Sequence, residues 1–77
     1  MQTLDQCALG AAVEVDHVVG DDPLSQRLVA LGFWPDARIM VEQCAPLGDP
    51  TLYSLHGYRL ALRRDEAVRV VVRAVVG

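Results

Sequence analysis

One stretch, residues 20–35, constrains the fold more than any other part of the chain, because its beginning and its end both indicate one short helix. Asp22 suits the N-cap position, where its carboxylate accepts hydrogen bonds from the free amides of the first turn. Pro23 then occupies the first helical position, where its missing N–H costs nothing. Gly32 suits a left-handed stop. We therefore predict a helix that begins after Asp22 and ends at Leu31.

The same stretch has an apolar face that favours burial. Leu24, Leu28 and Leu31 recur at i, i+4 and i+7, which places them on one side of a helix. Phe33 is placed to pack back on Leu28 as in a Schellman stop, and Pro35 prevents the helix from resuming. The residues expected to face away from the core are Ser25, Gln26 and Arg27.

Most of the remaining chain alternates apolar and polar residues, which is typical of half-buried strands. The predicted strands are 12–19, 37–43, 51–55, 58–63 and 68–75. His56-Gly57 has the length of a two-residue hairpin turn, residues 44–50 are rich in turn formers, and residues 64–67 are predicted to form one helical turn. The side chains expected to face inward are Val13, Val15, His17, Val19, Ile39, Val41, Tyr53, Leu55, Tyr58, Leu60, Leu62, Val70, Val72 and Ala74, with His17 near the rim. The closing strand is expected to turn Arg69, Val71, Arg73 and Val75 outward.

Composition excludes several classes of function. The 77 residues, 52% of them hydrophobic, are predicted to form a single domain over residues 1–77. All seven basic residues are arginines, and the absence of lysine excludes P-loop NTPases and Schiff-base enzymes. The net charge of −3 disfavours general nucleic-acid binding, whose affinity comes mainly from neutralised phosphates. A local basic face remains open, because five arginines gather in the last third, namely Arg59, Arg63, Arg64, Arg69 and Arg73.

The chain lacks signals for membrane insertion or export. No apolar run approaches the roughly 20 residues that a bilayer-spanning helix requires. The first residues lack the basic, apolar and small-residue series of a signal peptide, so we expect a cytoplasmic protein. Cys7 and Cys44 have no close cysteine partner in sequence, and we expect two reduced, partly buried thiols rather than a disulfide.

Five short strands with one helix inserted after the first predict a mainly β fold, a small, partly open, SH3-like five-stranded barrel. A series of sequence pieces then adds a resemblance, and these are Leu9-Gly10, Arg27-Leu28, Leu31-Gly32-Phe33 with Pro35, Gly48-Asp49-Pro50, and Gly57 to Arg63 with Glu66-Ala67. In this order and spacing the chain resembles the FeoA family, ferrous iron transport protein A, nearly from end to end. Asp36 departs from the family, which usually has glycine after the proline, but aspartate tolerates a left-handed turn.

The resemblance implies a small cytoplasmic accessory protein of bacterial ferrous iron uptake. The implied partner is the FeoB permease, a membrane transporter with a cytosolic GTP-binding domain, so that membrane contact is expected only through the partner. We expect no enzymatic activity, because Ser25 and Ser54 lack a matched histidine and acid. The alternative function is a nucleic-acid-binding barrel that uses the arginine-rich closing strand.

The candidates for partner contact are Arg27, Phe33 and Trp34, in the helix and directly after it, and Arg27 and Trp34 each have a structural alternative. Arg27 is expected on the exposed side of the helix, where it contacts either a partner or solvent or pairs with an acid such as Asp36. Trp34, flanked by Phe33 in the loop after the helix, is either an anchor for a partner or a cap on the core. Val71 and Val75 offer either the edge of a homo-oligomer surface or apolar area beneath the N-terminal segment.

Metal and cofactor binding are not expected. The potential ligands are His17, His56, Cys7, Cys44, Asp16, Asp21 and Asp22, and no pair of them has the spacing of a dedicated iron site. His17 is interpreted as a rim or core histidine and His56 as a turn residue, which leaves only adventitious divalent-ion binding.

Overall fold

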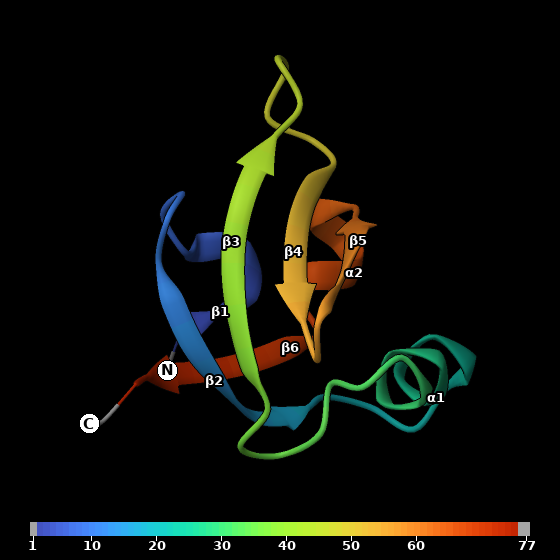
Figure 1. Ribbon diagram of the computed structural model, residues 1–77. Helices are drawn as coiled ribbons and strands as arrows, with labels where there is room; N and C mark the ends of the chain where they lie inside the picture. Colours follow the sequence, from blue (N-terminus) through green and yellow to red (C-terminus); the bar gives the residue numbers. More distant parts are fainter. Residues whose placement is uncertain (1, 76–77) are drawn as a thin grey trace.

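A computed structural model describes residues 2–75 as a single antiparallel sheet with helical turns packed around it (Figure 1). The sheet order is β1-β6-β2-β3-β4-β5, so that β1 and β5 form its two edges and the barrel is not closed. The strands are β1 (Gln2–Thr3), β2 (Ala12–Val18), β3 (Arg38–Cys44), β4 (Thr51–Leu55), β5 (Tyr58–Leu62) and β6 (Val70–Ala74). The mainly β, partly open fold is therefore confirmed. The sixth strand, β1, was missed because two residues carry no pattern.

Three helical segments accompany the sheet, namely η1 (Leu4–Gln6), α1 (Pro23–Ala30) and α2 (Arg64–Ala67). Figure 1 shows α1 beside one end of the sheet, while the loop between β3 and β4 extends from the opposite end. The predicted helical turn at residues 64–67 is confirmed as α2. Within residues 2–75, no helix has the length and apolar composition needed to cross a bilayer.

Helix α1 begins and ends as its capping residues predict. The Asp22 carboxylate accepts from the Ser25 amide at 3.3 Å, and Pro23 is the first helical residue. The Phe33 amide donates to the Leu28 carbonyl at 3.2 Å, and Gly32 has the left-handed φ of 113° that a Schellman stop requires. The helical hydrogen-bonding pattern stops at Ala30, with Leu31 as the C-cap.

The core lies on the inner face of the sheet. Its buried members come from every strand except β1, together with η1, α1, α2 and the loop after α1. They are Leu4, Val13, Val15, Leu28, Phe33, Ala37, Ile39, Val41, Tyr53, Leu55, Leu62, Ala67, Val70 and Val72. Leu24, Leu31 and Leu60 are partly buried and pack against this cluster, so the predicted leucine face of α1 is confirmed.

Ser25 was predicted on the solvent side of α1, and this was wrong. Its side chain is only 2% exposed, and its hydroxyl donates to the Asp22 carbonyl at 2.8 Å. A serine in the first helical turn can satisfy its own hydroxyl locally, and burial therefore costs it little.

Strand alternation also failed in β2 and β6. A register shift between Val15 and His17 in the β2–β6 pairing leaves His17 exposed and turns Val18, instead of Val19, toward the core. In β6 the predicted alternation is lost, because Val71 is buried and Ala74 is exposed. β6 lies between β1 and β2 in the sheet, and its residues Val70, Val71 and Val72 are all buried.

The chain reverses direction through two left-handed non-glycine residues. Asp36 has φ 73°, which confirms the left-handed turn expected where the family usually has glycine. His56 and Gly57 have φ values of 52° and 81°, as a two-residue hairpin turn requires. This turn places His56 and Tyr58 next to α1, and the candidate site is built there.

Candidate protein-binding surface at the end of helix α1

The end of α1 is covered by polar groups that belong to aromatic rings. The Trp34 indole Nε1–H donates to the Val29 carbonyl at 2.8 Å. The Nε2 of His56, from the β4–β5 turn, lies 2.8 Å from the Gly32 carbonyl, and this contact requires that Nε2 carries a proton. The Trp34 and His56 rings also pack on each other, with centroids 4.7 Å apart.

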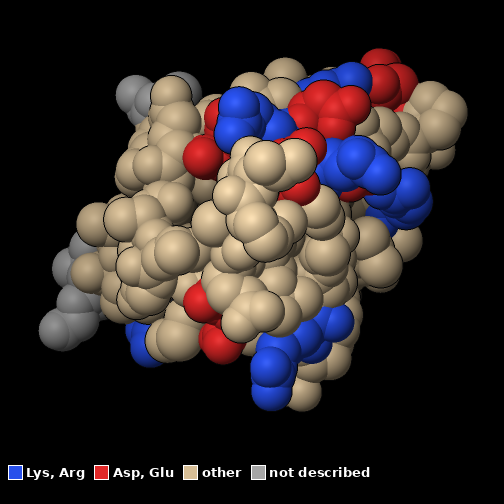
Figure 2. Space-filling model, turned by 90° about the horizontal axis from the view of Figure 1, so that it is seen from above, with Lys and Arg blue, Asp and Glu red and all other residues tan. Residues whose placement is uncertain are grey.

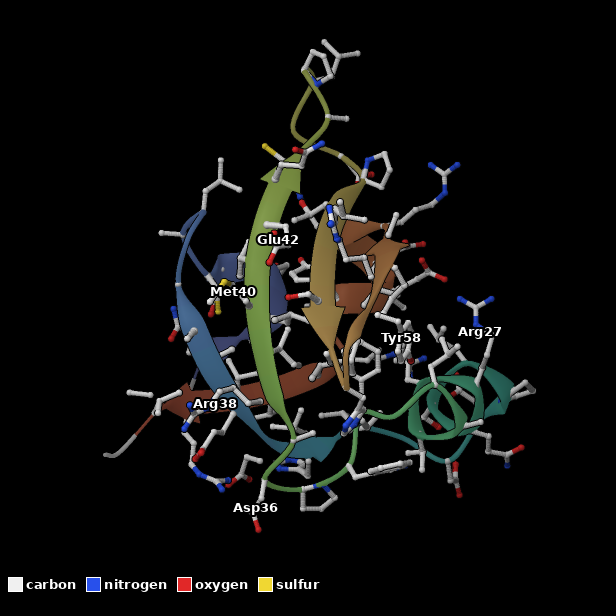
Figure 3. The ribbon with its side chains drawn as sticks, viewed as in Figure 1. Arg27, Asp36, Arg38, Met40, Glu42 and Tyr58 are labelled. Atoms are coloured by element: carbon white, nitrogen blue, oxygen red, sulfur yellow. The ribbon has the colours of Figure 1, made fainter. Side chains whose placement is uncertain are left out.

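Tyr58 completes this arrangement from the first residue of β5. Its hydroxyl donates to the Leu31 carbonyl, and in Figure 3 its ring lies between the sheet and α1. The last carbonyls of a helix have no partner within the helix and need one from elsewhere. We call Val29, Trp34, His56 and Tyr58 the α1-end surface. Its polar tips are satisfied within the chain, while its apolar parts face solvent.

The exposure of this surface is large for apolar side chains. Trp34 is 51% exposed, Val29 44% and Tyr58 40%. Tyr58 was predicted in the core, which was wrong, because its ring reaches sideways to the carbonyl of Leu31 instead of packing under the sheet. Amphipathic rings whose polar end is fixed and whose body is exposed are typical of protein-binding surfaces.

Arg27 lies beyond this surface, on the side of α1 that faces α2 (Figure 3). Its guanidinium pairs with Glu66, and its side chain is 57% exposed. Glu66 is 19% exposed and also accepts from the Arg63 amide at 2.9 Å, which fixes it at the start of α2. The acid suggested as the local partner, Asp36, pairs with Arg73 instead. Arg27 therefore joins two helices while much of its side chain remains accessible.

Phe33, the third candidate for partner contact, lies in the core with 0% exposure. The Schellman stop turns it inward, since its amide must reach the Leu28 carbonyl. A ring without accessible surface cannot touch a partner in this conformation. Trp34, the next residue, points outward, so the two aromatic residues have separate roles.

The arginine-rich closing strand does not offer a free basic face. Arg69 pairs with Asp22 at 2.6 Å, and Arg73 pairs with Asp36 and, at 3.4 Å, with Asp16. The Arg69 guanidinium lowers the pKa of the Asp22 carboxyl, and the Ser25 amide lowers it further. Figure 2 shows positive and negative side chains next to one another on the face it presents. These ion pairs leave little unbalanced positive charge on β6 for a phosphate backbone.

The potential metal ligands are dispersed. Among residues 2–75, no group of three or more His, Cys, Asp or Glu side chains is placed to hold a metal ion. His17 lies 2.6 Å from Asp16 and both are exposed, while His56 is engaged at the end of α1. Cys44 is exposed instead of partly buried. Burial and, to a lesser extent, the charge of Asp5 raise the pKa of the Cys7 thiol, which favours the protonated form rather than a thiolate ligand.

Three members of the α1-end surface were not predicted from the sequence, namely Val29, His56 and Tyr58. The hairpin turn at His56-Gly57 was recognised, but its distance of about 25 residues from α1 gave no indication that the two meet. A histidine in a position that usually takes asparagine was the available signal.

A partly open antiparallel sheet with one inserted helix defines the class of small SH3-like domains. The FeoA domain family matches residues 2–74, and the chain belongs to this family. The resemblance noted in the sequence is therefore confirmed, and the family is one of ferrous iron transport.

Relatives with known sequence or structure agree with this assignment. The chain is 32% identical over 72 residues to an Fe(2+) transport protein A/Fe(2+) transporter FeoB fusion protein of Porphyromonas gingivalis, covering 94% of this chain but 8% of the relative. The solution structure of iron(II) transport protein A from Clostridium thermocellum matches with a TM-score of 0.90 at 30% identity, over 96% of this chain and 46% of that one. Stenotrophomonas maltophilia FeoA, a zinc complex described as an SH3 domain protein, matches with a TM-score of 0.85 at 32% identity, over 95% and 91% of the two chains.

A manganese-dependent transcriptional repressor also shares the fold, with a TM-score of 0.84 at 17% identity over 96% of this chain and 41% of the repressor. At this identity the likeness concerns the fold alone.

Proposed function

We propose that this chain is a cytoplasmic accessory protein of ferrous iron uptake that binds the cytosolic part of a FeoB-type permease and modulates it by contact. The observation that carries the proposal is the Porphyromonas gingivalis relative, in which an Fe(2+) transport protein A and an FeoB transporter form one polypeptide. Two activities joined in one chain work at a high effective concentration, which suits partners that associate when separate. The chain acts through contact and not through catalysis.

The α1-end surface, with Arg27 at its border, is the docking surface that we propose. Exposed Trp and Tyr rings whose polar tips are fixed lose little entropy on binding, and Trp, Tyr and Arg dominate the energetic centres of interfaces. Trp34 is therefore the anchor. Arg27 contributes at the rim, where the existing Glu66 pair already orients it.

The test is a calorimetric titration of the purified chain with the cytosolic domain of the cognate FeoB. Trp34→Ala is expected to weaken binding about 30-fold, as for an interface anchor, and Arg27→Ala about fivefold. Leu47→Ala is the matched control, because Leu47 is the most exposed large apolar residue and lies in the loop at the opposite end of the sheet. It should leave the affinity unchanged.

Two results would contradict the proposal. Trp34→Ala and Leu47→Ala could have equal affinities while both variants remain folded by circular dichroism, which would remove the α1-end surface from the interface. Tight, salt-sensitive binding of a single-stranded oligonucleotide without any binding of FeoB would support the nucleic-acid alternative instead.

A further inference from the structure

The edge strand β5 presents unpaired backbone groups to solvent. β5 pairs with β4 through the register Leu55↔Tyr58, Tyr53↔Leu60 and Thr51↔Leu62. In a hairpin with a two-residue turn, the residues that flank the turn exchange hydrogen bonds, and every second pair along the ladder does the same. The amide and carbonyl groups of the intervening residues, Arg59 and Ala61, therefore point away from β4.

No other element takes up these groups. β5 is the last strand in the sheet order, and among the described residues no loop or cap forms a backbone hydrogen bond with Arg59 or Ala61. Both residues are exposed, and Figure 1 shows β5 at the border of the sheet. Proteins commonly protect such an edge with proline, a bulge, a covering loop or charged side chains, because it is a template for another strand. β5, with the sequence Y-R-L-A-L, has no proline, and its one charged residue, Arg59, disfavours an added strand that carries positive charge opposite it.

The arginines divide into two groups around this edge. Four of the seven form ion pairs with carboxylates in the described part of the chain, namely Arg27, Arg38, Arg69 and Arg73. The other three have no carboxylate within ion-pair distance there, and all three lie in or directly after β5, at Arg59, Arg63 and Arg64. In a chain with net charge −3, the positive charge without an internal partner is thus concentrated along one strand edge.

The spacing of these arginines matches an extended ligand. Side chains alternate along a strand, so Arg59, Ala61 and Arg63 share one face. Arg63 still has an extended backbone, with φ −73° and ψ 159°, which continues the alternation past the end of β5. Arg63 and Arg64 also line a concavity of about 510 Å³ together with Asp5, Asp49 and Asp65, where the charge is mixed. Arg59 is therefore the main electrostatic contact.

We propose that the β5 edge binds an extended, acidic peptide segment of a partner protein, which adds to the sheet as a further strand. The amides and carbonyls of Arg59 and Ala61 form the ladder, and carboxylates four residues apart on the ligand meet Arg59 and Arg63. A second copy of this chain fits less well, because its own β5 would place arginines against arginines. This surface adjoins the α1-end surface at Tyr58, the first residue of β5, but uses the backbone of Arg59 and Ala61, and the inference does not depend on the identity of FeoB as a partner.

The test uses NMR titration of the ¹⁵N-labelled chain with a nine-residue peptide of alternating valine and threonine that carries two glutamates four positions apart. The amides of Arg59 and Ala61 should shift most and become protected from exchange. A matched peptide with glutamine in place of both glutamates should bind about tenfold more weakly. Ala61→Pro removes an outward N–H while it leaves the β4 pairing intact, and should weaken binding at least tenfold. Ala61→Val keeps the N–H and should bind normally.

A second set of variants keeps the proposal testable if Ala61→Pro does not fold. Arg59→Gln should lower the affinity for the acidic peptide about threefold. Arg38→Gln removes the same charge from the outer face of β3 and should leave this affinity unchanged. The proposal is wrong if Arg59→Gln and Arg38→Gln bind alike, or if the largest shifts fall at Trp34 and His56. Displacement of the peptide by oligothymidylate at equal concentration would also overturn it and assign the edge to nucleic acid.

Discussion

The end of α1 and the edge of β5 lie close together, and each has backbone polar groups without partners in its own helix or sheet. Only those at the end of α1 find partners elsewhere in the chain. At the end of α1, Trp34, His56 and Tyr58 satisfy carbonyl groups that the helix leaves without partners. Along β5, the outward groups of Arg59 and Ala61 have no backbone partner from a loop or cap in the described residues. The end of α1 is a preorganised surface with exposed ring faces, whereas β5 is a sheet edge with unpaired backbone groups. A preorganised surface favours a folded partner, and an unpaired sheet edge favours an extended segment.

The largest expected effect is a difference in stability between alanine substitutions at Phe33 and Trp34, the two aromatic residues after α1. Phe33→Ala should lower the free energy of unfolding by about 4 kcal/mol, because it empties a fully buried ring position. Trp34→Ala should cost about 1 kcal/mol, the loss of one hydrogen bond and one ring contact at the surface. Urea denaturation measures both values. Equal losses would mean that Trp34 is part of the core and not an anchor.

The next effect tests how closely the end of α1 is packed. Gly32→Ala should cost about 3 kcal/mol, because alanine strains the φ of 113° and its Cβ would lie 2.6 Å from the His56 ring. Gly57→Ala is the matched control, since it also has a positive φ, 81°, but no atom within 4 Å of the new Cβ. It should cost about 1 kcal/mol in the same denaturation experiment. If the two losses are equal, the contact between His56 and the helix end is not tight.

A pH experiment tests whether Tyr53, on the core face of the β4–β5 hairpin, is shielded from water. Burial raises the pKa of Tyr53 to about 12, while the unfolded chain has a value near 10. The folded state therefore favours the neutral phenol, and the stability that this contributes is complete below pH 10 and is lost as the pH rises toward 12. Between pH 10 and 12 the free energy of unfolding of the unsubstituted chain should fall by about 2 kcal/mol more than that of Tyr53→Phe, which has no phenol to ionise. Parallel curves would show that Tyr53 ionises freely in the folded chain.

The smallest expected effect is on the β5 edge. Arg59→Gln should change the free energy of unfolding by less than about 0.5 kcal/mol, because no ion pair within the described residues depends on it. Arg27→Gln should cost slightly more, up to about 1 kcal/mol, since it breaks the pair with Glu66. Thermal denaturation in low salt resolves the two. A larger loss for Arg59→Gln would indicate an internal role and weaken its assignment to a ligand.

Local signals predicted the helix and the turns well. The N-cap at Asp22, the glycine stop at Gly32 and the left-handed turns at Asp36 and His56 all depend on the conformational limits of single residues. Such limits act over three or four neighbouring residues, so they can be read without knowledge of the rest of the chain. The alternation of β3 and β4 was equally clear, since each has one face on the core.

The errors arose where neighbours from distant parts of the chain decide exposure. A register shift in β2 changes the exposure of His17 and Val19, and Val71 is buried where β6 pairs with both β1 and β2. Tyr58 lies outside the core because its hydroxyl donates to the Leu31 carbonyl at the end of α1, 27 residues away in the sequence. The candidate site was therefore predicted only in part: Trp34 and Arg27 are exposed, Phe33 is buried, and Val29, His56 and Tyr58 were not predicted.

By itself the amino-acid sequence determined the mainly β architecture, the single capped helix α1, its leucine face and the membership in the FeoA family, because periodicity, capping and turn residues are properties of short segments. Only the tertiary structure decided which aromatic residues meet at the end of α1 and which arginines remain without a carboxylate. Both outcomes depend on the antiparallel order of the strands, which brings residues 22 to 57 positions apart into contact. No local pattern records those distances.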